Sequence, residues 1–189
     1  NTNRMKYESL VPDRFYHIYN GGNNRENIFL EEKNYDYFLL LLQRHISPVA
    51  QIFAYCLLKN HSHLVIRTKN EIEEQKISRA FSNLFNAYAK AVNKAYDRRG
   101  SLFEDRFKRI LIDDERYLIN LIIYVHLNPE NHNMIGNFEQ YNYSSYQGIL
   151  SNNVDYIERQ EVLKFFGGSK NFAAAHKGVH DFQTLKYLE

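Results

Sequence analysis

The strongest constraint on the fold is a pair of apolar segments separated by only two residues. Residues 51–58 form an apolar run with β-branched and aromatic side chains, and residues 61–67 (HSHLVIR) form a second segment that contains β-branched residues. Such runs are typical of buried strands. Because only Lys59 and Asn60 separate them, we predict two consecutive strands with a tight connection.

The segments on either side of this pair predict a complete order of strands and helices. Short apolar patterns predict further strands at residues 14–19 and 107–112, and apolar spacings of three and four predict helices at 34–45, 77–98 and from Asp113 or Asp114 to about Leu127. Gly100 and Pro129 are the expected stops of the last two helices. The order β-α-β-β-α-β-α predicts an α+β fold: a ferredoxin-like (split βαβ) antiparallel sheet with helices on one face, plus an extra helix.

Length and composition limit the class of protein. The chain has 189 residues, of which 44% are hydrophobic and 24% charged, the balance of a globular chain with one domain or one domain and an appendage. The longest apolar run, residues 52–58, is far shorter than the ~20 residues of a membrane span. The single cysteine, Cys56, fits a core position and excludes a cysteine-rich zinc site. The first ten residues lack the apolar stretch of a signal peptide, so we expect a cytoplasmic protein without a membrane partner.

Positive charge is concentrated in one part of the chain. Residues 76–109 contain nine basic and three acidic residues, a net charge of +6 within a chain of net charge +2. Such a segment fits a nucleic-acid backbone as partner, and it also fits a solvated helix face. The 15 tyrosines and 13 phenylalanines could likewise stack on bases or fill a core that lacks tryptophan.

A histidine pair opens the second predicted strand. His61 and His63 are two residues apart, so their side chains project from the same face of a strand. Two imidazoles on a stiff strand provide half of a divalent-metal site, although two surface histidines would have the same spacing. Tyr124 and Asn128 are four residues apart on the last helix and share a helical face. The amide of Asn128 can ligate Mg²⁺ or Mn²⁺, and the same two residues also fit a core aromatic and a helix end.

Taken together, five elements resemble a known family. HSHLVI resembles the metal-binding element of the HUH single-tyrosine transposases, and YVHLNP (residues 124–129) resembles the tyrosine-bearing helix of the REP-associated tyrosine transposases. Three further elements follow the order of that family: YHIYNGGNNRENIF (16–29), GSLFEDRFK (100–108) and YNYSSY (141–146). The resemblance covers residues 14–150. Ser62, where the family usually has an apolar residue, departs from the pattern.

The resemblance implies a function and a set of site residues. His61, His63 and Asn128 would bind Mg²⁺ or Mn²⁺, and Tyr124 would be the nucleophile that cleaves and rejoins single-stranded DNA next to hairpins through a 5′-phosphotyrosine. Tyr117 is a rival nucleophile seven residues earlier, His17 a possible neighbour of the metal ligands, and His126 a structural residue. The basic segment predicts non-specific DNA contacts from Lys90, Arg98, Arg99, Arg106 and Lys108.

The remaining predictions concern organisation and alternatives. We expect a transposase domain at residues 1–150 and a C-terminal extension at 151–189 packed on it, with a helix at about 160–166, in a monomer or a homodimer. One alternative is an inactive DNA-hairpin-binding protein derived from a transposase. Another is an RNA-binding module of the same shape, which would need paired aromatics on an exposed sheet face instead of the histidines.

Overall fold

The computed structural model describes residues 9–180 and 182, and its centre is one antiparallel sheet. The strands are β1 (Phe15–Gly21), β2 (Ala50–Leu58), β3 (His61–Thr68) and β4 (Lys108–Ile112), in the order β2-β3-β1-β4. All neighbouring pairs are antiparallel. This is the strand order of a split βαβ fold, so the predicted fold class is confirmed.

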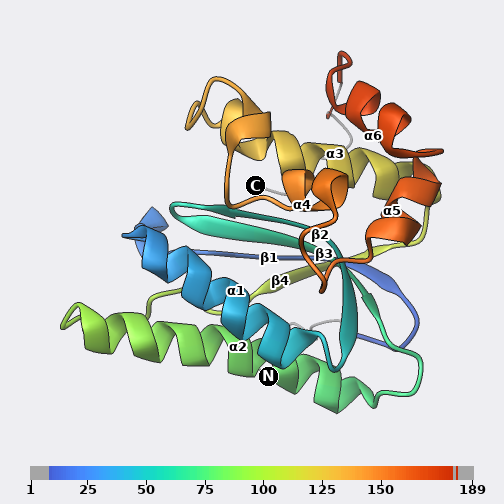
Figure 1. Cartoon of the computed structure of the whole chain (residues 1–189). Helices are drawn as coiled ribbons and strands as arrows, with labels where there is room; N and C mark the ends of the chain where they lie inside the picture. The colour runs from blue at the N-terminus through green and yellow to red at the C-terminus, as the bar shows by residue number, and fades with distance from the viewer. Residues whose placement is uncertain (1–8, 181, 183–189) are drawn as a thin grey trace.

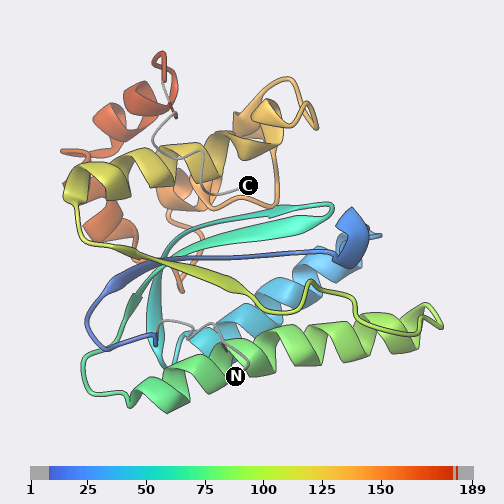
Figure 2. The ribbon, with the colours of Figure 1, turned by 180° about the vertical axis from the view of Figure 1, so that it is seen from behind.

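Helices cover both faces of the sheet. Helices α1 (Glu32–Ile46) and α2 (Glu74–Ala95) lie together on one face, and α3 (Glu115–Asn131) crosses the other (Figures 1 and 2). Three short helices share the α3 side: α4 (Tyr146–Ser151), α5 (Arg159–Phe165) and α6 (Ser169–His176). Short 3-10 turns occur at Asn23–Arg25 (η1) and Phe138–Gln140 (η2). Because both faces are covered, β2 is buried along almost its whole length, which explains its continuous apolar sequence.

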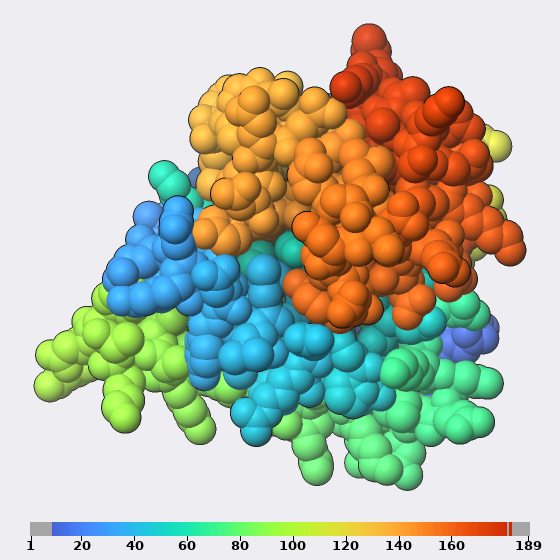
Figure 3. Space-filling model, viewed as in Figure 1, coloured from blue at the N-terminus to red at the C-terminus, as the bar shows by residue number. Residues whose placement is uncertain are grey.

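The segments after α3 also close one edge of the sheet. The backbone of Leu57 donates to Tyr143, that of Ser145 donates to Tyr55, and that of Glu158 donates to Ile52. In the space-filling view these C-terminal segments and α1 hide most of the strands (Figure 3). The predicted extension from residue 151 therefore includes segments that contact β2 and α3. Residues 1–8 of the predicted domain, and residues 181 and 183–189 of the extension, lie outside the described residues.

Two predicted helix ends are wrong, for identifiable reasons. Pro129 lies inside α3, which continues to Asn131. Proline disfavours a helix interior, but here the backbone of His132 still donates to the carbonyl of Asn128, so the helix continues past Pro129. Helix α2 ends at Ala95 rather than residue 98, because Asp97 has a φ of 47°, in the left-handed region that ends helices.

The beginning of α3 agrees with the prediction. The carboxylate of Asp114 accepts a hydrogen bond from the backbone of Tyr117 at 2.7 Å, as expected of an N-cap. Among the described helices, none combines the length and the apolar character that a membrane crossing requires.

Candidate functional site

The pairing of β1 with β3 fixes the positions of the two histidines. His63 lies opposite Tyr19, and His61 lies opposite Gly21. The two imidazole rings are 5.0 Å apart, centroid to centroid. His63 is buried and His61 half-buried. Strand alternation therefore places both rings on one face, and the contacts of His63 with α3 described below identify it as the α3 face.

Each histidine has its Nδ1 atom in a hydrogen bond. Nδ1 of His61 lies 2.7 Å from Oδ1 of Asn60, and Nδ1 of His63 lies 2.9 Å from Nε2 of His17. Nε2 of His63 is buried without a partner among the described residues. Metal-binding histidines commonly show this arrangement, in which one nitrogen is held by a neighbour and the other is left for the ion. His17, predicted as a neighbour of the ligands, thus contacts His63 directly.

Burial keeps these imidazoles neutral. Desolvation lowers the pKa of His61 to about 4, with a smaller effect of His132, and lowers the pKa of His17 to about 3. The pKa of His63 is also well below its usual value, first because of burial and then because of the neighbouring histidines. At pH 7 all three rings therefore have the uncharged form that a metal ligand needs.

Helix α3 brings the predicted tyrosine to the same place. The ring of Tyr124 meets that of His63 edge to face, with centroids 6.0 Å apart, and it also meets the ring of Phe182, with centroids 5.4 Å apart. Tyr124 is 6% exposed. For the rival Tyr117 there is no ring contact with either histidine of β3, and burial together with Tyr19 raises its pKa. The structure therefore places Tyr124, rather than Tyr117, against the histidine pair.

Asn128 lies one helical turn after Tyr124 and is fully buried. Its amide oxygen and nitrogen both lack hydrogen-bond partners among the described residues. A buried amide without a partner is costly, so this side chain fits a ligand that supplies the missing contact. In contrast, His126 hydrogen-bonds to Ser145 at 2.7 Å and to His176 at 2.8 Å, which supports its structural interpretation.

The donor types of the predicted ligands suit a divalent ion. In the part of the chain that the structure describes, no three His, Cys, Asp or Glu side chains are grouped so that they could hold a metal. The candidate set is instead two imidazoles and one amide oxygen. Its unpartnered atoms are Nε2 of His63 and the amide of Asn128. Such a set leaves coordination positions for phosphate oxygens and water, as catalysis by Mg²⁺ or Mn²⁺ requires.

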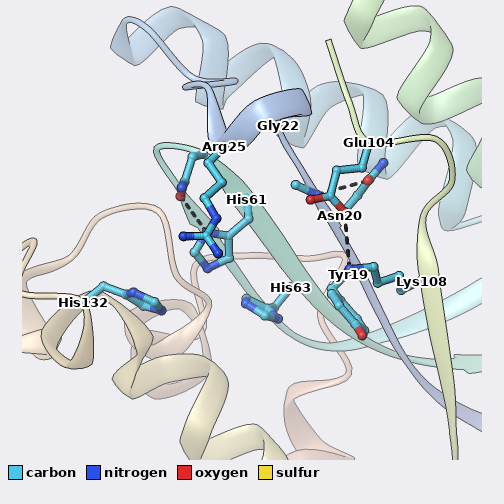
Figure 4. A pocket seen from close by; sticks show the side chains of 11 residues that line it. Tyr19, Asn20, Gly22, Arg25, His61, His63, Glu104, Lys108 and His132 are labelled. Atoms are coloured by element: carbon cyan, nitrogen blue, oxygen red, sulfur yellow. Dashed lines mark hydrogen bonds and ion pairs between the residues drawn. The ribbon is translucent and has the colours of Figure 1, made fainter. Parts of the chain in front are cut away.

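The histidines open into a cavity of about 350 Å³ (Figure 4). It is lined by Tyr19, Asn20, Gly21, Gly22, Arg25, Asn60, His61, His63, Glu104, Lys108 and His132. Two cations, Arg25 and Lys108, therefore share this cavity with the histidines. Of these two, the sequence predicted only Lys108 as a DNA contact. Arg25 and His132 were not predicted as site residues. Arg25 lies in the element 16–29, but no spacing relates either residue to the histidines, and the fold brings both beside β3.

A second cavity of about 480 Å³ lies between α2 and the segment that precedes β4. It shares Asn20 and Glu104 with the first cavity, and Arg106 and Arg109 are among its lining residues. The other predicted DNA contacts are dispersed. Arg98 forms an ion pair with Glu26 at 2.8 Å, while Lys90 and Arg99 are exposed and line neither cavity.

Comparisons with known proteins agree with the fold. No protein-family model matches the chain, and no curated protein is similar to it in sequence. Among solved structures, the chain is similar to a REP-associated tyrosine transposase bound to a REP hairpin, with a TM-score of 0.65 and 14% identity over 79% of this chain and 86% of that chain. A tRNA(His) guanylyltransferase from Saccharomyces cerevisiae aligns with a TM-score of 0.45 and 10% identity over 96% of this chain and 81% of that chain, a level that does not establish a shared fold. The first similarity shows that this chain and the transposase have the same fold.

Proposed function

We propose that the protein is a metal-dependent transposase or endonuclease of single-stranded DNA that cleaves and rejoins strands next to hairpins. The observation that carries the proposal is the contact of the Tyr124 ring with His63, whose Nε2 atom is buried without a partner among the described residues. A nucleophilic phenol and a neutral metal ligand thus lie side by side. The similarity of the fold to a hairpin-bound tyrosine transposase supports DNA as the partner.

The chemistry follows from the groups present. Oη of Tyr124 attacks the phosphorus of one phosphodiester in line, the 3′-hydroxyl of the upstream strand leaves, and a 5′-phosphotyrosine bond forms. This covalent bond preserves the energy of the diester, so that a second 3′-hydroxyl can attack it and rejoin the strand without ATP. A phenol has a pKa near ~10 in water, and a bound dication would favour the phenolate and neutralise the phosphate. His61, His63 and Asn128 would hold that ion, either Mg²⁺ or Mn²⁺.

Single-stranded DNA fits the site better than a duplex does. The tyrosine must approach one phosphate from a fixed direction, and a flexible strand can bend towards His63, which lines the cavity and contacts Tyr124, although Tyr124 itself does not line it. Lys90, Arg98, Arg99, Arg106 and Lys108 would contact phosphates around it. We propose this partner for a protein acting in the cytoplasm, as a monomer or a homodimer.

A covalent adduct on a denaturing gel tests the proposal. The full chain is incubated with labelled hairpin oligonucleotides that carry randomised single-stranded flanks, with Mn²⁺ or with EDTA. We expect an adduct that needs the metal, disappears in Tyr124→Phe and His63→Ala, and persists in the matched control Tyr117→Phe. An adduct that survives in Tyr124→Phe, or none in the unmodified protein, contradicts the proposal.

A second candidate is a hairpin-binding protein without activity. The small exposed fraction of Tyr124, 6%, and its contact with Phe182 favour this candidate, because a covered nucleophile cannot react. It predicts hairpin binding without an adduct in the same assay. The RNA-binding alternative is disfavoured, because helices lie over both faces of the sheet (Figures 1 and 2) and the cavity on the sheet is lined by His61 and His63, where such a module would need paired aromatics.

A further inference from the structure

Arg25 has an unusual backbone conformation at the edge of the histidine cavity. Its φ is 60°, and that of the preceding Asn24 is 55°. This left-handed region is unfavourable for a residue with a long side chain, whereas asparagine tolerates it better. Non-glycine residues in this region persist where the surrounding structure enforces them, and they concentrate at functional sites.

The surrounding structure does enforce this conformation. The backbone of Gly22 donates to Asn60 at 2.7 Å, that of Asn23 donates to Leu102 at 2.9 Å, and that of Arg25 donates back to Gly22 at 2.9 Å. The turn closes so tightly that a side chain at position 22 would collide with the carbonyl oxygen of Glu26. The turn of η1 is therefore fixed to Asn60, the residue immediately before His61.

The side chain of Arg25 is available for a ligand. It is exposed and forms no ion pair or hydrogen bond with the described residues, whereas Lys108, the other cation of the cavity, lies 3.3 Å from Glu104. In Figure 4 the Arg25 side chain extends from η1 towards His61, and Lys108 lies on the far side of His63. A guanidinium group binds phosphate through two parallel hydrogen bonds and keeps its charge at any ordinary pH.

We propose that Arg25 binds the non-bridging oxygens of the phosphate that Tyr124 attacks. This inference rests on the proposed function and adds a residue and a contact to it. The fixed turn holds the guanidinium beside the histidine pair before DNA arrives, which reduces the loss of side-chain freedom on binding. The unfavourable backbone conformation is then the cost of presenting an arginine at this position.

Two substitutions in the same turn separate the side chain from the backbone. Arg25→Gly removes the guanidinium and also the energetic cost of a non-glycine residue at a φ of 60°. Asn24→Gly removes only the corresponding cost at a φ of 55°, because Asn24 does not line the cavity. We expect both variants to unfold at the same or a higher temperature than the unmodified protein. Only Arg25→Gly should weaken binding of the hairpin oligonucleotides, by about tenfold, as the loss of a charged hydrogen-bonded contact implies. Equal binding by the two variants overturns the proposal.

A double-mutant cycle with modified DNA identifies the contact. Binding is measured in the Tyr124→Phe background, with oligonucleotides that each carry one uncharged methylphosphonate at successive positions of the flank. At one position of the flank, we expect the methylphosphonate and Arg25→Gly to weaken binding by similar factors. Combining the two changes there should weaken binding no further than either change alone, and that position should match the cleavage site. Additive effects at every position overturn the proposal and leave a Tyr124-dependent adduct intact. If Arg25→Gly and one methylphosphonate have non-additive effects but the unmodified protein forms no adduct, Arg25 contacts that phosphate and the proposed cleavage activity is refuted.

Discussion

At the scale of single residues, the candidate metal site depends on which nitrogen of each histidine is hydrogen-bonded to a neighbour, because the other nitrogen is the one left to bind an ion. The spacing of His61 and His63 in the sequence predicts that they share a face, and the structure places them so. The sequence could not predict that His17 would hold Nδ1 of His63, because that contact depends on the register between β1 and β3. For the same reason Arg25 could not be identified from its sequence position alone.

The contact between His17 and His63 predicts an effect on metal binding. His17→Phe keeps a buried ring but removes the nitrogen that orients His63. We expect the affinity for Mn²⁺ to fall by roughly 10- to 100-fold, as is typical when the partner of a ligand is lost. Titration calorimetry on the full chain measures this, with His45→Gln on α1 as the control. An unchanged affinity in a folded His17→Phe protein would show that the contact does not orient a ligand.

At the scale of elements, α3 serves both the candidate site and the core. Tyr124 meets His63 on one side of the helix. His126, two residues later, joins Ser145 and His176 in a buried hydrogen-bonded chain that attaches α6. The sequence predicts the start of α3 at Asp113 or Asp114, because a cap is a local signal, and the structure shows that Asp114 is the cap. Its end was predicted wrongly, because the helical hydrogen bonds continue past Pro129, with the backbone of His132 donating to Asn128.

The cap of α3 is a stability prediction. Asp114→Ala removes the acceptor for the backbone of Tyr117 and should lower the free energy of unfolding by about 1 kcal/mol. Chemical denaturation measures the change. The neighbouring Asp113→Ala is the matched control and should have little effect. Equal losses in the two variants would argue against Asp114 as the cap.

The buried chain of His126 and His176 predicts a loss of stability in acid. Burial lowers the pKa of His176 to about 4 from its ordinary value of 6.5, so the unfolded chain binds more protons than the folded one between these values. The free energy of unfolding is therefore highest above pH 6.5 and declines as the pH falls to about 4, by on the order of 3 kcal/mol from this residue. Denaturation curves across this range should show a smaller decline in His176→Gln. An identical pH dependence in that variant contradicts the prediction.

At the scale of the whole molecule, helices lie over both faces of the sheet, and a cavity opens beside His61 and His63. The order of elements through α3 could be predicted, because each has a clear period and local end signals. The short helices α4 to α6 are less predictable, because they depend on packing against β2 and α3. The basic segment differs most from its prediction. Its cations are continuous in sequence, yet the structure distributes them between two cavities, ion pairs and exposed surface.

This distribution predicts which cations affect DNA binding most. Lys108 lines the first cavity and Arg106 the second, so Arg106→Ala and Lys108→Ala should each reduce the salt dependence of binding by about one phosphate contact. Fluorescence anisotropy at several salt concentrations measures the slope. Arg44→Ala, on the exposed side of α1, is the control. Slopes that match the control would remove these two residues from the interface.

The central claim is that Tyr124 becomes covalently bound to DNA at a site held by two histidines. Mass spectrometry of the protein after incubation with hairpin oligonucleotides and Mn²⁺, followed by digestion, measures this directly. The account predicts a nucleotide attached to the peptide that contains Tyr124, and no such mass when His63 is replaced by alanine. A modified peptide containing Tyr117 or Tyr19 instead, or no modified peptide from a protein that binds the hairpin, would contradict it.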